Sequence, residues 1–324
     1  MTLHEIFWGT VSPFFYWIAP NQRLYWVYLA TAFLLAACVY AVHRQRSGST
    51  KSFLQYCFPK DVYLHKSAIT DYKYYVVNRI AFVFLFTPLI VGTELSSSVV
   101  TAVLSGAFPT SVGAFGDAGW IAMAFLTVGV VFAHDFSVFY THLLQHRIPV
   151  LWEFHKVHHS AEVLTPITVY RMHPVDDIFT GWLVGLTTGA VYGVFAHLFT
   201  ATPSELMVNG LNVVLFVFYV AGFNLRHTHI WLPYTGIWGR LLVSPAHHQI
   251  HHGTDPRYYD RNYGLIFAFW DWMAGSLYVP EPHQEIEFGL GPESEDYRTV
   301  WRLYTLPFVK VLHRLRGTTL GEVS

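Results

Sequence analysis

Residues 119–146 read GWIAMAFLTVGVVFAHDFSVFYTHLLQH, an apolar run that passes directly into two histidines. A helix needs about 20 mostly apolar residues to cross a bilayer, and residues 119–141 meet that requirement. His142 and His146 follow at positions i and i+4, so the same helix would present both rings on one face. The stretch therefore predicts a membrane protein with polar chemistry at the end of a span.

The composition of the whole chain agrees with a membrane protein. Hydrophobic residues make up 53% of the 324 residues, and charged residues make up only 13%, against roughly 25% in soluble domains. The formal net charge is -1, so the basic surplus typical of nucleic-acid binding is absent and we expect no nucleic-acid partner. Cys38 and Cys57 form no CxxC pair, which argues against a disulfide framework and a thiolate metal site.

Hydrophobic runs predict about five transmembrane helices, with four to six as the range. Besides 119–141, the predicted spans are 24–43, 80–103, 178–199 and 205–226. Pro88 and Glu94 weaken the prediction for the span 80–103. The shorter apolar run 6–20 contains Pro13 and Pro20, so we expect an interfacial segment there.

Lys and Arg residues predict the orientation of these spans. They are concentrated in the segments after the first, third and fifth predicted spans, and are absent from 104–118. This pattern places the N-terminus outside and every Lys and Arg except Arg23 on the cytoplasmic side. We predict an all-α, polytopic membrane protein in one domain, 1–324, with a cytoplasmic helical cap formed by 142–177 and 227–324.

Histidines are the unusual feature of the composition, and fourteen of the nineteen lie between His134 and His252. They occur in the motifs HLLQH (His142, His146), HKVHH (His155, His158, His159), RHTH (His227, His229) and HQIHH (His248, His251, His252). Crowded imidazoles would repel one another if charged and would leave ring nitrogens unpaired if neutral. A bound metal resolves both problems, because neutral imidazole is the ligand form.

The eight histidines of HLLQH, HKVHH and HQIHH together with His227 are too many ligands for one ion, and they suit two ions with four or five ligands each. All-imidazole ligation is compatible with Fe, Zn or Cu and excludes Mg and Ca. We expect the isolated histidines elsewhere to lie at the membrane interface, with the polar edge of each ring toward water. These are His4, His43, His65, His197, His283 and His313.

The three histidine motifs on a polytopic helical chain resemble the fatty acid hydroxylase/sterol desaturase superfamily of membrane di-iron oxygenases. The resemblance covers about 130–280 and includes DFSVFYTHLLQH, EFHKVHHSAE, RMHP at 171–174, SPAHHQIHH, and NYG with WDWMAGSLY within 262–278. It implies that two iron ions, with zinc as a substitute in a structure, are held by His142, His146, His155, His158, His159, His227, His248, His251 and His252.

Five further residues near these motifs have open roles. His173 would be a tenth ligand or a hydrogen-bond donor beside the ligands. His247 lies just outside the third motif, and His134 and His229 occupy positions where other polar residues are commoner in the family. Asp135 would either accept the second ring N–H of a ligand histidine or form a hydrogen bond inside its own helix.

The resemblance implies an O2-dependent attack on an unactivated C–H bond of a sterol, fatty-acyl chain or related membrane lipid, by hydroxylation or desaturation. The chain has no GxGxxG, CxxCH or cluster-binding cysteine set. We therefore expect a separate electron donor, a ferredoxin or cytochrome b5-like protein. Lys156, Arg240, Arg257 and Arg261 are candidate docking residues, and they suit lipid headgroups equally well.

The site is expected on the cytoplasmic side of an integral membrane protein. The absence of an N-terminal cytochrome b5 domain and of C-terminal retrieval lysines favours a bacterial inner membrane over the endoplasmic reticulum.

Three other functions compete with this hypothesis. The first is a membrane-embedded zinc-dependent hydrolase. The chain has no HExxH motif, and only Glu153 or Glu162 could serve as the catalytic base of such an enzyme. A b-type haem carrier needs single histidines facing each other inside the bilayer. A metal transporter needs ionisable residues at mid-depth, where the predicted spans carry only Glu94, His134, Asp135 and His197.

Overall fold

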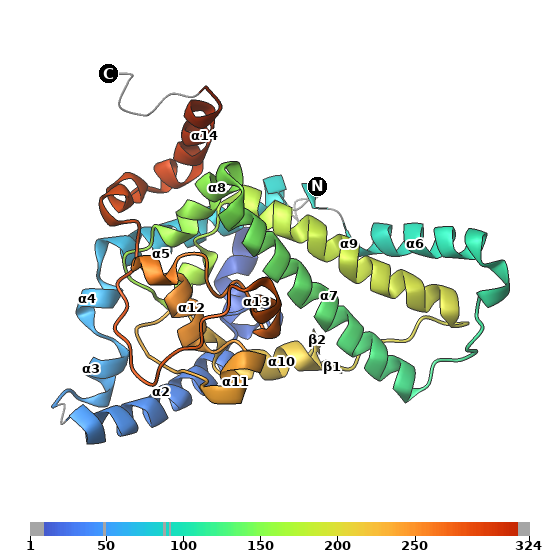
Figure 1. The fold of residues 1–324 in the computed structure, drawn as a ribbon, viewed down its shortest axis with the longest axis horizontal. Helices are drawn as coiled ribbons and strands as arrows, with labels where there is room; N and C mark the ends of the chain where they lie inside the picture. The colour runs from blue at the N-terminus through green and yellow to red at the C-terminus, as the bar shows by residue number, and fades with distance from the viewer. Residues whose placement is uncertain (1–9, 48–49, 87–88, 91, 317–324) are drawn as a thin grey trace.

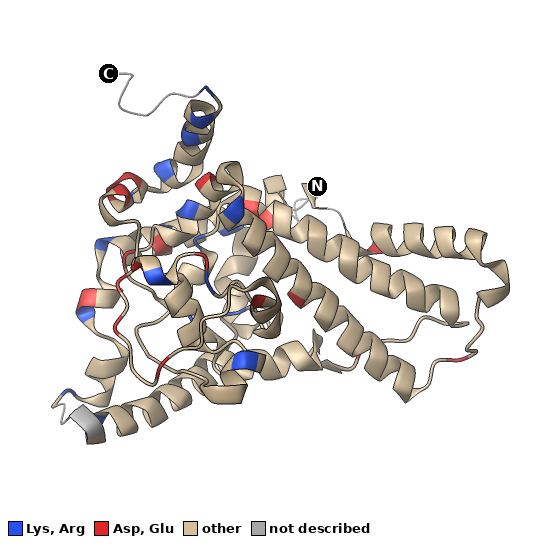
Figure 2. Ribbon diagram, viewed as in Figure 1, with Lys and Arg blue, Asp and Glu red and all other residues tan. Residues whose placement is uncertain are grey.

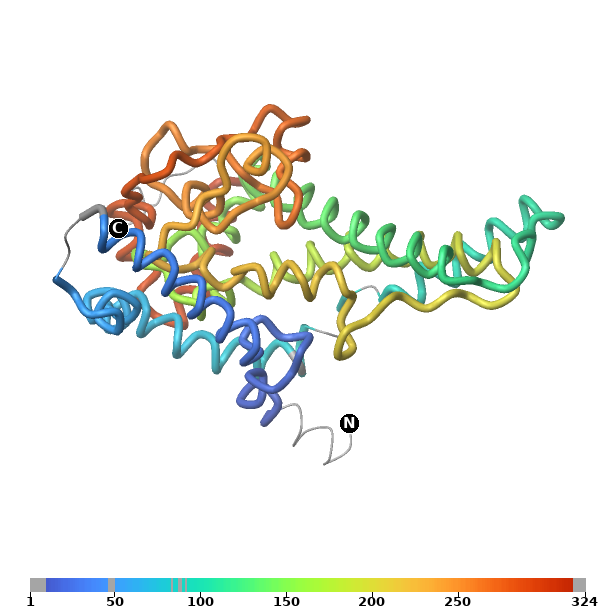
Figure 3. The backbone as a smooth tube through the Cα atoms, turned by 90° about the horizontal axis from the view of Figure 1, so that it is seen from below, coloured from blue at the N-terminus to red at the C-terminus, as the bar shows by residue number. Residues whose placement is uncertain are grey.

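A computed structural model describes residues 10–47, 50–86, 89–90 and 92–316 of the chain. It is mostly helical, and its longest helices are α7 (Trp120–Arg147) and α9 (Pro174–Leu198). These two helices form an arm with α6 (Thr93–Ala107), and the three run side by side in Figures 1 and 3. Most other elements lie in a body formed by 50–86, 148–173 and 223–316, at one end of the arm.

The remaining helices include three of 16 to 22 residues, α2, α5 and α14, and several shorter ones. The α-helices are α2 (Trp26–Ser47), α3 (Phe53–Cys57), α4 (Lys60–Tyr63), α5 (Lys66–Ala81), α8 (Pro149–His159), α10 (Val213–Val220), α11 (Gly236–Leu241), α12 (Pro245–His251), α13 (Phe269–Ala274) and α14 (Val300–Arg316). A π-helical turn, η2, covers Phe82–Phe86, and 3₁₀ turns include η1 (Ser12–Ile18), η5 (Pro166–Tyr170), η6 (Phe223–Leu225) and η8 (Gly291–Tyr297).

Among the described residues, three helices are long and apolar enough to cross a membrane. They are Trp26–Gln45, Trp120–Arg147 and Pro174–Leu198, and they agree with the predicted spans 24–43, 119–141 and 178–199. Figure 2 shows Lys, Arg, Asp and Glu concentrated in the body and sparse along the arm. The apolar surfaces of the arm and of α2 (Trp26–Ser47) are therefore the parts of the molecule that suit a bilayer.

The prediction of a continuous span over 80–103 was wrong. Helix α5 ends at Ala81, the π-helical turn η2 follows, and α6 begins only at Thr93. The sequence had already weakened this prediction at Pro88, which lies outside the described residues, because proline has no amide hydrogen for a helical hydrogen bond. The 15-residue helix α6 covers only about 22 Å at 1.5 Å per residue.

The predicted span 205–226 was also wrong, because an Asn-Gly turn divides it. Strands β1 (Met207–Val208) and β2 (Leu211–Asn212) pair antiparallel around Asn209 and Gly210, which have φ angles of 50° and 77°. Two central residues with positive φ are typical of a tight hairpin. The eight-residue helix α10 that follows is about 12 Å long, too short to cross the roughly 30 Å hydrocarbon core.

Glycines at every fourth position of α9 allow α6 to pack unusually close. A Cβ atom at Gly189 would lie 2.5 Å from the Cβ of Ser96, and one at Gly193 would lie 2.7 Å from the Cβ of Val100. The Ser96 hydroxyl donates a hydrogen bond to the Leu186 carbonyl at 2.8 Å across this contact. Small residues in this spacing are typical of helix packing in membranes, and they hold the arm together without a large apolar core.

A buried ion pair connects the elements around the second histidine motif. The Arg171 guanidinium lies 2.6 Å from the Asp71 carboxylate, and both side chains are almost fully buried. Arg171 also donates to the Val157 carbonyl at 2.9 Å and to the Ser160 hydroxyl at 2.8 Å. The pair thus fixes α8 against α5, and α8 carries three of the motif histidines.

Candidate metal centre

The nine histidines predicted from the motifs lie together in two groups at the junction of the arm and the body. The five-histidine group contains His142, His146, His155, His159 and His251. The four-histidine group contains His158, His227, His248 and His252. Within each group, one ring nitrogen of every residue lies within 4.8 Å of the others, so each group could hold a metal ion.

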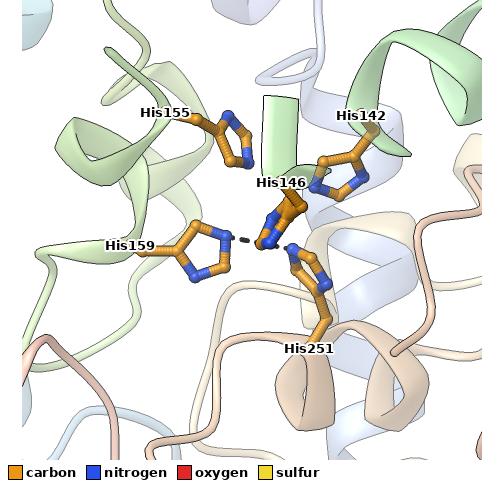
Figure 4. Close-up of side chains that lie close together, drawn as sticks. All are labelled: His142, His146, His155, His159 and His251. Atoms are coloured by element: carbon orange, nitrogen blue, oxygen red, sulfur yellow. Dashed lines mark hydrogen bonds between the residues drawn. The ribbon is translucent and has the colours of Figure 1, made fainter. Parts of the chain in front are cut away.

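The rings of the five-histidine group point toward a common centre (Figure 4). His142 and His146 come from the last turns of α7, His155 and His159 from α8, and His251 from α12. The Nε2 atoms of His142, His146 and His155 are buried and have no hydrogen-bond partner among the residues that the structure describes. The Nε2 atoms of His159 and His251 lie 3.0 Å apart. Buried nitrogens without partners are costly unless a ligand takes their lone pairs.

Backbone carbonyls determine which ring nitrogen faces this centre. The Nδ1 of His142 donates to the Tyr263 carbonyl at 2.9 Å, and the Nδ1 of His251 donates to the Arg261 carbonyl at 2.7 Å. A carbonyl oxygen can only accept a hydrogen bond, so the proton of each neutral ring lies on Nδ1. Both Nε2 atoms therefore offer a lone pair, as metal ligation requires.

The loop that supplies these carbonyls has an unusual backbone. Asp260 and Asn262 have φ angles of 60° and 58°, a left-handed conformation that Asp and Asn tolerate better than most residues. The Asn262 amide donates to the carbonyls of His247 and Tyr278 at 3.1 and 2.9 Å. The buried Asp271 carboxylate accepts the Tyr263 amide at 2.8 Å. These bonds hold the loop so that its carbonyls meet the rings.

The four-histidine group is equally tight. The Nε2 of His227 lies 3.3 Å from that of His158 and 2.9 Å from that of His248, and the Nε2 atoms of His248 and His252 are 3.1 Å apart. Metal–nitrogen bonds of about 2.0–2.1 Å place the ligand atoms of a tetrahedral site about 3.3 Å apart. The Arg226 guanidinium donates to the Nδ1 of His248 at 3.0 Å, so the proton of this neutral ring lies on Nε2 and would have to leave that atom before it could bind a metal.

Burial keeps these rings neutral. It lowers the pKa well below its ordinary value, and positive charge on neighbouring rings or on Arg226 lowers the pKa further. This holds for His155, His158, His159, His227, His248, His251 and His252. Neutral imidazole is the form that binds metal.

The other candidate histidines lie outside both groups, and three of them have structural partners. His173 caps α9, where its Nδ1 accepts the Val175 amide at 3.1 Å, so it is not a tenth ligand. The Nε2 of His247 donates to the Gly239 carbonyl at 2.9 Å. The Nε2 of His229 donates to the Tyr56 carbonyl at 2.6 Å. Neither group contains His134.

Both expected roles of Asp135 were wrong. Its carboxylate accepts the backbone amides of Ile266 and Phe267 at 2.7 and 3.2 Å and the Trp270 ring N–H at 2.9 Å. It therefore anchors the segment after Tyr263 to α7, and within the described part of the chain none of its hydrogen-bond partners is a histidine.

A carboxylate beside a ring of the five-histidine group is that of Asp176, whose Oδ2 lies 3.4 Å from the Nδ1 of His155. The sequence reasoning missed Asp176. Its signal was the acidic pair at 176–177, one residue after RMHP and in the first turn of α9.

Two cavities meet the nine histidines from different sides. The first cavity, of about 350 Å³, is lined by His142, His155, His158, His227 and His248. The second cavity, of about 450 Å³, is lined by His146, His159, His251 and His252. Each histidine thus lines one of the two cavities, and both groups reach both cavities.

Arg23 also lines the first cavity. The charge pattern had placed it on the opposite side of the membrane from the histidines, and that part of the topology was wrong. The segment before α2 packs against the body, where the Asn224 amide donates to the Arg23 carbonyl at 2.9 Å.

A known protein family matches the region of the chain that contains the nine histidines. Residues 127–276 match the family model described as fatty acid hydroxylase, and this range includes all nine histidines. The match confirms the resemblance predicted from the motifs. No solved structure matches the chain significantly.

Curated relatives cover about half of this chain. An alkylglycerol monooxygenase of Danio rerio is 31% identical over 175 residues, 54% of this chain and 34% of the relative. A Delta(7)-sterol 5(6)-desaturase of Gibberella zeae is 32% identical over 165 residues, 51% of this chain and 45% of the relative. A lathosterol oxidase of Mus musculus is 28% identical over 178 residues, 54% of this chain and 51% of the relative. The chain thus spans only about a third to a half of the length of these relatives.

Proposed function

Because residues 127–276 belong to the fatty acid hydroxylase family, we propose that the protein is an O2-dependent oxidoreductase that hydroxylates or desaturates an unactivated C–H bond of a membrane lipid. The names of the relatives support oxidation of lipids. The observation that carries the proposal is the convergence of nine buried imidazoles in two groups. Three helices of spanning character support a place in a membrane, and we propose the inner membrane of a bacterium, with the site on the cytoplasmic side.

The residues fit two iron ions. One ion would be held by His142, His146, His155, His159 and His251, and the other by His158, His227, His248 and His252. The unpartnered Nε2 atoms support this assignment, and the absence of thiolate or carboxylate from either group agrees with Fe, Zn or Cu. Two bound iron ions would supply the O2 chemistry that oxidation of a C–H bond requires.

The chain's own residues prepare the site for that chemistry. The carbonyls of Tyr263 and Arg261 hold two rings in the ligating tautomer. The first cavity, partly apolar and in contact with both groups, is the pocket that we assign to the lipid.

The second cavity, lined by polar residues such as Lys156 and Asp260, is the route that we assign to small reactants. We place the separate electron donor, a ferredoxin or cytochrome b5-like protein, beside this cavity, where Arg257 and Arg261 flank its lining residues.

Metal analysis of the purified protein tests the proposal. We expect two irons per chain, and lipid-dependent O2 consumption with a ferredoxin and its reductase. Removal of iron by a chelator should abolish O2 consumption, and Fe²⁺ should restore it where Zn²⁺ does not. One zinc per chain, with hydrolysis and no O2 consumption, would instead support the membrane zinc hydrolase.

Asp176→Ala is expected to weaken metal binding about 10- to 100-fold, because partners that orient a ligand histidine usually contribute that much. The substitution removes the carboxylate 3.4 Å from the Nδ1 of His155. Competition with a chelator of known affinity measures the change. Asp177→Ala is the matched control, because the neighbouring carboxylate pairs with Arg79 and not with a ligand. Equal metal affinities in the two variants would contradict the role of Asp176.

A further inference from the structure

Arg23 is a cation in the wall of the first cavity. Among residues 10–47, 50–86, 89–90 and 92–316, its guanidinium forms no ion pair, and its most evident contact is the Phe223 ring, 5.3 Å from its central carbon. The side chain is half-buried. A charge with reduced access to water is costly unless an opposite charge accompanies it. The wall therefore presents a cation that has no opposite charge within ion-pair distance among the described residues.

The rest of the wall is rich in hydrogen-bond donors and poor in acids. Besides Arg23, the charged residues of the wall are Arg79, Arg226 and Asp177. Asp177 is already paired with Arg79 at 3.1 Å. Donor atoms of three lining residues are buried without a partner in the described part of the chain. These are the Nε atoms of Arg79 and Arg226 and the Nε2 of Gln145.

We propose that the first cavity holds its lipid by an anionic headgroup, a carboxylate or a phosphate, that pairs with Arg23. A guanidinium binds either anion through two parallel hydrogen bonds, and the cavity already joins Arg23 to the histidines of both groups. A neutral lipid with a single hydroxyl leaves the Arg23 charge without an opposite charge. The assignment of this cavity to the substrate rests on the proposed function.

The position of Arg23 in the chain explains how such a preference would arise. Arg23 lies in the segment before α2, outside residues 127–276 that match the family. The matched region supplies all nine histidines, and a segment beyond it supplies the cation. Related proteins can therefore share the metal centre and differ in the lipid headgroup that they accept.

Equilibrium binding of radiolabelled palmitate to the purified, metal-loaded protein in neutral detergent tests the proposal. Unlabelled palmitate, 1-palmitoyl lysophosphatidate and hexadecanol serve as competitors with the same chain length. The variants are Arg23→Gln, Arg23→Lys and Arg240→Gln. Arg240 is exposed on α11 and does not line the cavity, so Arg240→Gln removes one charge elsewhere.

We expect at least one of the two anions to compete about tenfold more strongly than hexadecanol, since a charged hydrogen bond is worth about that factor or more. The stronger of the two identifies the headgroup as carboxylate or phosphate. Arg23→Gln should remove the preference, Arg23→Lys should keep part of it, and Arg240→Gln should keep all of it. The metal content of every variant should equal that of the parent protein.

Competition by hexadecanol as strong as that of both anions would overturn the proposal. So would an undiminished preference in Arg23→Gln, which would indicate an anion on the metal centre or general headgroup contact. The assay measures no turnover. Anion binding that depends on Arg23, in a protein that never consumes O2, would therefore refute the proposed oxidation and leave the headgroup site in place.

Discussion

His251→Ala is expected to abolish lipid-dependent O2 consumption and to reduce the bound metal from two ions per chain toward one. His251 supplies one Nε2 atom of the five-histidine group, 3.0 Å from the Nε2 of His159. Alanine removes this ligand and leaves the Arg261 carbonyl without its donor. The fold should persist, because the expected destabilisation is about 1–3 kcal/mol. Metal analysis, O2 consumption and size-exclusion chromatography of one preparation measure all three effects.

His247→Ala is the matched control, because His247 lies on the same short helix and outside both groups. Its ring bonds to Ser244 and to the Gly239 carbonyl, so its loss should lower stability and leave two metal ions per chain. Normal turnover in His251→Ala, or equal metal loss in the two variants, would show that the assignment of ligands is wrong.

Asp71→Ala is expected to lower the free energy of unfolding by about 3–5 kcal/mol, the usual cost of leaving one partner of a buried ion pair alone. Asp71 is 1% exposed and Arg171 is 2% exposed, so water cannot compensate for the lost carboxylate. Arg171 would remain charged between α5 and α8. Denaturation of the metal-free protein in detergent, followed by tryptophan fluorescence, measures the change without a contribution from metal binding.

Asp255→Ala removes a carboxylate from an ion pair at the surface and provides the comparison. Its partner Arg257 has a side chain 71% exposed, and pairs of that kind contribute about 0–1 kcal/mol. A similar small loss in Asp71→Ala would mean that Arg171 finds another partner or that water enters the pocket.

The histidine spacing predicted which residues converge, but it did not divide them between two centres. In HKVHH, His155 and His159 belong to the five-histidine group and His158 to the other. In HQIHH the division is reversed, with His251 in the five-histidine group and His248 and His252 in the other. Neighbouring residues on a helix differ by about 100° in direction, so one histidine motif can supply rings to both groups. Only the placement of α8 against α12 decides the division.

Other errors have separate physical causes. Hydropathy recognised the three long helices, but it does not register the Asn-Gly turn at 209–210. The carbonyls of Arg261 and Tyr263 could not be predicted as partners of ligand rings, since every residue has a carbonyl. Their orientation depends on the left-handed backbone at Asp260 and Asn262.

The division of the nine histidines between two cavities has a kinetic consequence under the proposed function. The imidazoles form a partition, with five rings facing one compartment and four facing the other. A lipid bound in the first compartment leaves the second one open to dissolved gas, water and protons. Neither reactant has to arrive first, so initial velocities should follow random-order, not compulsory-order, addition of lipid and O2.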